Sequence, residues 1–155
     1  MQEFFQHLIQ SLSEAVGEPL AIEEGTRVHC DFDEFPLLFQ YLPDAEQVLL
    51  AVPLAEIPED DREARYRALL HGQYLFHQTG GGALSLDEEG RFACLQIVKD
   101  IRSLTPENFP VLVENFLHVA QYWRDRCLAA DPAEAAGTSS TAPTAEPHGV
   151  TMLRV

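Results

Sequence analysis

The spacing of apolar residues changes repeatedly along this chain, and this pattern constrains the fold more than any other feature. Three segments repeat apolar residues every three or four positions, the period of an amphipathic helix. Five others alternate apolar and polar residues, the period of a strand. The predicted helices span residues 2–16, about 61–77 and about 105–127, and the predicted strands 28–32, 35–41, 48–54, 83–86 and 92–98. The order α-β-β-β-α-β-β-α predicts an α+β fold with three helices packed on a twisted antiparallel sheet.

Turn and capping residues separate these segments. Gly17 follows the first helix, and three glycines at residues 80–82 separate the second helix from the fourth strand. The sequence DEEG at residues 87–90 predicts a hairpin turn. Thr105 is a suitable N-cap for the last helix, with Pro106 at its first position. The predicted boundaries are therefore marked at both ends of most elements.

Composition divides the chain into two parts. Residues 1–128 carry the periodic segments, and a domain of this size has room for a hydrophobic core. Residues 129–155 are rich in Ala, Pro, Ser and Thr and poor in large apolar side chains. We therefore predict one folded domain over 1–128 and a flexible tail over 129–155.

The charge of the chain excludes several classes of partner. Its formal net charge is −15, and the first 60 residues hold 13 acids against the single base Arg27. Phosphate backbones and anionic lipids repel such a chain, so neither nucleic acid nor a membrane is an expected partner. The N-terminal residues show no signal-peptide pattern and no segment is apolar enough to span a membrane, so a cytoplasmic location is expected.

The chain shows no catalytic or metal-binding pattern. Cys30, Cys94 and Cys127 are far apart in sequence and are expected to be reduced core thiols. The glycines at 80–82 lack the Lys and Ser/Thr of a phosphate-binding loop. No group of His, Cys, Asp or Glu has metal-ligand spacing. We therefore predict a protein that is not an enzyme, with no cofactor and no metal.

Several strands are apolar on both faces. Leu49 and Ala51 alternate with Leu50 and Val52, and the segment 92–98 behaves in the same way. One of the three helices could cover part of the second face by packing within the chain, and a subunit interface or a bound peptide would cover the rest. The sequence therefore indicates a protein that binds other polypeptides.

Three sequence segments together resemble the class I chaperones of bacterial type III secretion systems, the Tir chaperone family. The segments are LAEIPEDDREARYRALLHGQYLF (54–76), TGGGALSLDEEGRFACLQ (79–96) and FPVLVENFLHVAQYWRDRC (109–127). They occur in the order and at the spacing of the family, and the resemblance covers about residues 1–127. The family often has Asn at the position of Gln73, and the tail lies outside the resemblance.

The resemblance implies a homodimeric, ATP-independent, acidic cytoplasmic chaperone that takes part in virulence. Such proteins hold an N-terminal segment of a secreted effector unfolded and export-competent and deliver it to the type III export apparatus. No catalytic residue comes with the family. The client is expected on the first helix and the first three strands, where apolar side chains and net negative charge coincide.

Two sets of residues are predicted to form these interfaces. The predicted effector-binding side chains are Leu8, Leu12, Phe35 and Leu37. The predicted dimer interface comprises Leu70, Tyr74, Leu84, Leu86, Leu95 and Ile97, from the second helix and the second hairpin.

Two other functions compete with this interpretation. A thiol hydrolase would use Cys94 or Cys30, provided that the fold brings a histidine and a carboxylate to the thiol. An acidic adaptor or immunity-type protein would instead bind a folded partner through its acidic surface.

Overall fold

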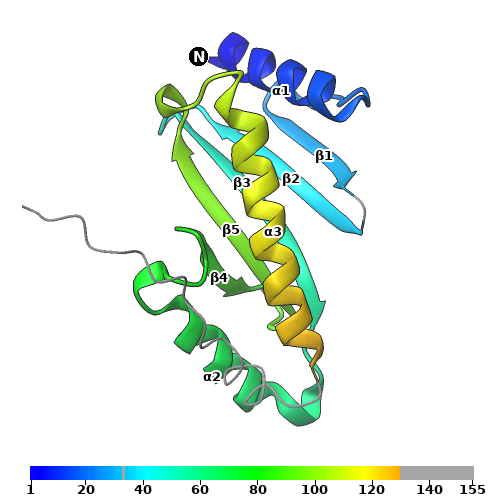
Figure 1. Ribbon diagram of the computed structural model, residues 1–155, viewed down its shortest axis with the longest axis vertical. Helices are drawn as coiled ribbons and strands as arrows, with labels where there is room; N and C mark the ends of the chain where they lie inside the picture. Colours follow the sequence, from blue (N-terminus) through cyan, green and yellow to red (C-terminus); the bar gives the residue numbers. More distant parts are fainter. Residues whose placement is uncertain (33, 130–155) are drawn as a thin grey trace, which may run out of the picture.

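The computed structural model describes residues 1–32 and 34–129 and confirms the predicted α+β element order (Figure 1). The elements are α1 (Gln2–Val16), β1 (Arg27–Phe32), β2 (Phe35–Leu42), β3 (Gln47–Glu56), η1 (Glu59–Asp61), α2 (Arg62–Gln73), η2 (Tyr74–Phe76), β4 (Ala83–Leu86), β5 (Phe92–Asp100), η3 (Ile101–Ser103) and α3 (Asn108–Leu128). Asp33 and the predicted tail from residue 130 onward lie outside the described residues.

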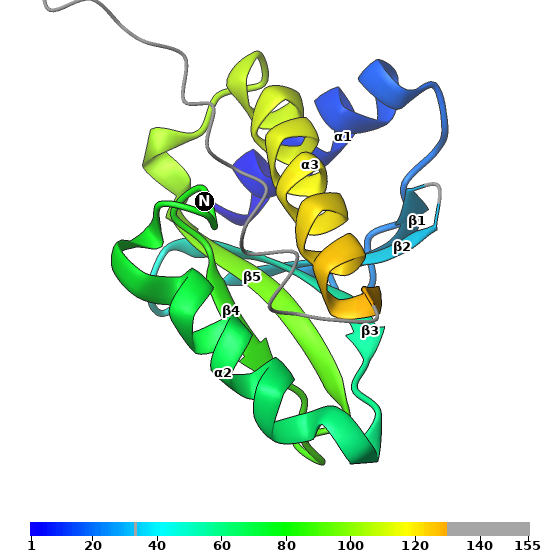
Figure 2. The ribbon, with the colours of Figure 1, turned by 60° about the horizontal axis from the view of Figure 1, so that its bottom comes forward.

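The five strands form one antiparallel sheet in the order β1-β2-β3-β5-β4. β1 and β4 are therefore the two edges. Helices α1 and α3 lie on the same face of the sheet, and α3 runs across it diagonally (Figures 1 and 2). Because successive side chains of a strand point to opposite faces, this arrangement sorts every strand residue into a helix-facing or an opposite row.

The core lies between the sheet and the two helices. One row of paired residues crosses the sheet toward the helices and is buried. Its members are Val28, Phe39, Leu50 and Ile97. From α3, the ring of Phe109 packs 5.8 Å from that of Phe39, centroid to centroid. Alternation in the strands and the three-to-four spacing in the helices thus supply the two sides of one core.

Helix α2 packs beside β4 and against the C-terminal end of α3. Gly72 allows α2 to approach the indole ring of Trp123. The buried guanidinium of Arg65 donates to the carbonyl oxygens of Cys127 and Ala129 at the end of α3. Gln73 bonds to the backbone at Gly82 and accepts from the Leu84 N–H at 2.6 Å. These contacts fix α2 to two other elements.

The C-terminal end of α2 and the N-terminal end of α3 differ from their predicted positions. α2 ends at Gln73 rather than near His77, because Leu75 and Phe76 adopt left-handed φ angles of 54° and 57°, which interrupt the helix. At the last helix, the Asn108 N–H donates to the Thr105 hydroxyl and the Asn108 side chain accepts from the Thr105 N–H. Thr105 therefore makes the predicted capping contact, although the assigned helix begins at Asn108.

Candidate functional site

The face of the sheet opposite α1 and α3 is the candidate functional site, and we call it the outer face. Its side chains are half-buried or exposed, whereas the helix-facing row is buried. Between the strand ends, none of its positions on β2, β3 and β5 carries a charge. They are Pro36, Leu38, Gln40, Leu49, Ala51, Pro53, Cys94, Gln96 and Val98. In a chain with 23% charged residues, such a surface is typical of an interaction site.

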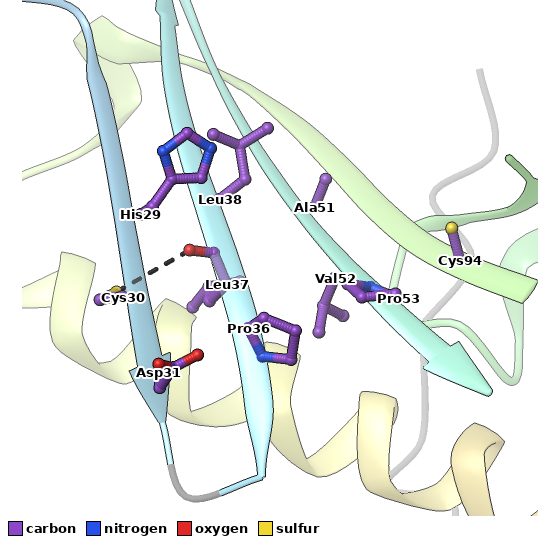
Figure 3. Close-up of a pocket in the computed structure, with 10 residues that line it drawn as sticks. All are labelled: His29, Cys30, Asp31, Pro36, Leu37, Leu38, Ala51, Val52, Pro53 and Cys94. Carbon is purple, nitrogen blue, oxygen red and sulfur yellow. Dashed lines mark hydrogen bonds between the residues drawn. The ribbon is translucent and has the colours of Figure 1, made fainter. Parts of the chain in front are cut away.

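A pocket of about 370 Å³ opens on the β1 side of this surface (Figure 3). Four strands contribute to its lining. The residues are His29, Cys30, Asp31, Pro36, Leu37, Leu38, Ala51, Val52, Pro53 and Cys94. Most of these side chains are aliphatic or proline, so the pocket accepts apolar groups by excluding water from them.

Two polar side chains of β1 border the pocket. Asp31 is exposed, and the Nδ1 atom of His29 lies 3.2 Å from the carboxylate of Glu23. Over residues 1–32 and 34–129, the pocket lining contains no lysine or arginine. The β1 side of the outer face therefore combines an apolar surface with carboxylates, which complements a partner that carries cationic side chains.

The two thiols of the pocket lack the features of a nucleophile. Burial, reinforced by Asp31, raises the pKa of Cys30 to about 11. Burial, followed by the charge of Asp87, also raises the pKa of Cys94. The sulfur of Cys30 lies 3.9 Å from the Leu37 carbonyl oxygen and that of Cys94 3.8 Å from the Phe92 carbonyl oxygen, so within the described residues neither thiol bonds to a histidine. A raised pKa keeps the thiol protonated and works against the thiol-hydrolase hypothesis.

Residues 1–32 and 34–129 contain no group of three or more His, Cys, Asp or Glu side chains able to hold a metal ion. Within the same residues, no helix is both long and apolar enough to cross a membrane.

The structure places all four predicted effector-binding side chains in the core. Leu8 and Leu12 lie on the face of α1 that packs inward, and Phe35 and Leu37 belong to the helix-facing rows of β2. Each is buried, so these side chains stabilise the fold, and of the four Leu37 also contributes to the lining of the pocket. Alternation located the two faces of β2 correctly, but only the position of α3 decides which face is covered.

The predicted dimer residues divide into two groups. Leu70 and Tyr74 are highly exposed, at 74% and 72%, and Leu86 is also exposed while Leu84 is half-buried. Leu95 and Ile97 are instead buried in the helix-facing rows of β5, a correction to their assignment to an interface. The physical reason is the same as for β2, because α3 covers that face of the sheet.

Sequence reasoning missed two further groups of residues. Leu75 and Phe76 are exposed next to Leu70 and Tyr74, and we call these four residues the α2 patch. The run of apolar residues at 74–76, ahead of the three glycines, was the available signal. Pro36 and Pro53 border the pocket. The available signal was a proline inside a segment that alternates apolar and polar residues like a strand, because proline in a strand indicates an irregular sheet.

The chain matches a known protein family over most of its length and shares its fold with several solved structures. The model of the Tir chaperone protein (CesT) family matches residues 7–124. No curated protein matches the chain significantly.

Several solved structures have the same fold. A chain of the ExsC–ExsE complex superposes with a TM-score of 0.72 at 20% identity, covering 84% of this chain and 98% of that one. A chain of the HopA1–SchA chaperone–effector complex gives a TM-score of 0.64 at 18% identity, with 80% and 95% covered. A chain of the ExoT–SpcS complex from Pseudomonas aeruginosa gives 0.60 at 17% identity, with 78% and 97% covered.

Proposed function

The chain belongs to the Tir chaperone protein (CesT) family, the class I type III secretion chaperones, and from this premise we propose how it binds its client. It holds an N-terminal segment of a secreted effector in an unfolded, export-competent state, without ATP, and passes it to the type III export apparatus. It works in the cytoplasm and has no catalytic role. The similar structure from the HopA1–SchA complex comes from a chaperone–effector assembly, which supports this proposal.

The observation that carries this proposal is the uncharged outer face. The chain has 25 acidic residues, yet the outer face carries no charge in the middle of β2, β3 and β5. Both faces of these strands are largely apolar there. Leu49 is half-buried and Val98 is 46% exposed, so apolar area is available there. Covering that area with client side chains removes it from water, which supplies the binding free energy.

An extended client suits this surface better than a folded one. β1 is an edge strand, and its free backbone groups beyond the bridge between Glu23 and Arg27 can pair with an added strand. Main-chain pairing at the edge requires an extended segment, and side chains of that segment then reach the neighbouring outer face. Because the client becomes ordered on binding, a large negative heat-capacity change is expected.

The active form is a homodimer in this proposal, with the α2 patch at the interface. Leu70, Tyr74, Leu75 and Phe76 all expose more than half of their surface. Exposed aromatic and aliphatic side chains of this size, grouped at the end of α2 and in η2, are typical of a surface that another subunit covers. Leu84 and Leu86 of β4 extend this interface toward the sheet.

Calorimetry with N-terminal segments of type III effectors, supplied unfolded, tests the proposal. The wild-type protein should bind a segment equally with and without ATP or EDTA. Leu49→Asp introduces a charge on the outer face and should abolish binding, whereas Val111→Asp, on the exposed surface of α3, should leave it unchanged. A strict preference for folded effectors would favour the adaptor hypothesis, and a requirement for ATP or metal would contradict the chaperone proposal.

A further inference from the structure

The hydrogen-bonded ladder between β2 and β3 ends early, at the pair Leu38 and Ala51. Both strands continue beyond that pair, since β2 remains paired with β1 as far as Phe35 and β3 remains paired with β5 as far as Glu56. The two strands separate toward these ends (Figure 3). The sheet thus contains a local gap between its second and third strands.

Two prolines explain where the gap begins. Continuing the register by two residues places Pro36 opposite Pro53. The Tyr41 N–H donates to the carbonyl oxygen of Thr26, which precedes β1, so the backbone of Tyr41 bonds on the β1 side of β2. Backbone groups of successive strand residues point to opposite sides, so Pro36 and every second residue after it point toward β3. Neither proline has an N–H, so the ladder step at this pair cannot form. The register shift between Pro53 and Ala55 bends β3 at the same place.

The gap presents hydrogen-bond acceptors without the donors that would normally face them. The carbonyl oxygens of Pro36 and Pro53 point into the space between the strands, by the same alternation. Asp31 of β1 is paired in register with Pro36 and lines the same pocket from the β1 side. Pro36 and Pro53 are exposed, so a donor from a bound partner can reach these carbonyl oxygens and replace the missing ladder bond.

The pocket of about 370 Å³ includes residues on both sides of this gap, and most of its lining is aliphatic or proline. Leu38 and Ala51 close one end, and Leu37 and Val52 are the next pair between the strands. An entering group therefore meets apolar contacts along its length and oxygen acceptors around its head. An arginine side chain has this distribution, with an aliphatic stem and a planar head that offers five donors.

We propose that the gap between β2 and β3 receives an arginine side chain of the bound client segment. This inference rests on the proposed chaperone function and assigns that function a specificity determinant. The guanidinium donates to the two proline carbonyls and pairs with Asp31, while the stem contacts Leu38 and Ala51. Among the described residues, no lysine or arginine lines the pocket, so none of their cations compensates these acceptors. Clients with an arginine beside apolar residues are therefore preferred.

A direct test uses N-acetyl-arginine amide as the probe and N-acetyl-citrulline amide as its neutral isostere. Titration monitored by nuclear magnetic resonance should shift the signals of Leu38 and Ala51 with the arginine probe. The citrulline probe should bind about tenfold more weakly, because hydrogen bonds from a charged donor are stronger. Equal binding of the two probes, or shifts confined to another surface, would overturn the assignment.

Two variants and one control locate the site. Asp31→Asn should weaken binding of the arginine probe up to about fivefold at low salt, as loss of a partly exposed ion pair does. Asp44→Asn removes an exposed acid in the turn between β2 and β3 and should have no effect. Ala51→Leu should block both probes with an unchanged melting temperature. Retention of the arginine preference in both site variants would contradict the proposal.

Client binding separates this inference from the chaperone proposal. If an effector segment binds and replacing its arginines by citrulline leaves the affinity unchanged, only the arginine assignment fails. If the arginine probe binds in the gap but no effector segment binds the protein, only the chaperone proposal fails. The chain's own Arg154 is an alternative occupant, and stronger probe binding by an Arg154→Ala variant would assign the gap to that residue instead.

Discussion

Gly72 on α2 lies directly against the indole ring of Trp123 on α3, where a Cβ atom would overlap the ring. The same indole donates from Nε1 to the carbonyl oxygen of Gln78 at 2.9 Å, so Trp123 holds both α2 and the turn that follows it. The α2 patch is carried by these elements. The glycine–tryptophan contact therefore helps to fix the position of the proposed dimer surface.

Gly72→Ala should destabilise the protein by about 1–3 kcal/mol, because the added methyl group overpacks the site. Chemical denaturation measures the change in the free energy of unfolding. Trp123→Leu provides the matched background, and in it Gly72→Ala should cost less, since the ring is no longer there. An equal cost in both backgrounds would show that helix propensity, not the contact, decides the residue at this position.

Arg65 is predicted to be the second attachment of α2. It is 6% exposed and donates to the carbonyl oxygens of Cys127 and Ala129 at the C-terminus of α3, where a cation is favoured. Arg65→Met should cost about 1–3 kcal/mol in denaturation experiments, because these acceptors lose their donor. Arg67→Met is the control, since among the described residues Arg67 forms only an exposed pair with Glu63, and its loss should change stability little.

Phe116 should be more important for stability than all residues after 129. Its side chain is buried in the middle of α3, and Phe116→Ala should cost about 3–5 kcal/mol. Deletion of residues 130–155 should cost little. Thermal melts of the two variants decide the point, and a larger loss on deletion would place the domain boundary further along the chain.

Light scattering should report a homodimer of about 34.6 kDa, twice the 17.3 kDa of the chain. Leu70→Asp should give a folded monomer, because it places a charge in the α2 patch. Val111→Asp is the control on another exposed surface and should remain dimeric. Leu95→Asp should instead unfold the protein, since Leu95 is buried in the core of one subunit. A monomeric wild type at micromolar concentration would refute the proposed dimer.

The raised pKa of Cys30 predicts a loss of stability at alkaline pH. Its pKa is raised by burial from 9.0 to about 11, so the folded state disfavours the thiolate more than the unfolded state does. The stabilisation is fully present below about pH 9 and is lost as the pH rises toward 11. Denaturation of the wild type and of Cys30→Ala over this range should show a steeper decline in the wild type. Parallel curves would show that Cys30 does not titrate in this way.

The order and type of the elements were predictable because they depend on local periodicity. The stripe of α1 and the alternation of β2 each arise within a few consecutive residues, and both elements were predicted within one residue of their bounds. The end of α2 was harder to place, because the left-handed backbone at Leu75 and Phe76 contradicts the helical spacing of that segment. The family resemblance was confirmed for the same reason, since its motifs are also local.

The sequence by itself determined the acidic charge, the sequence of helices and strands, and the presence of strands with two apolar faces. Only the tertiary structure decided which face is the core. Leu49 and Leu50 are neighbours with the same side chain, yet α3 covers Leu50 and leaves Leu49 on the outer face. Likewise, only the register of β2 and β3 decides that Pro36 and Pro53 fall opposite each other where the two strands separate. Periodicity is set by adjacent residues, whereas coverage and register depend on contacts between segments far apart in the chain.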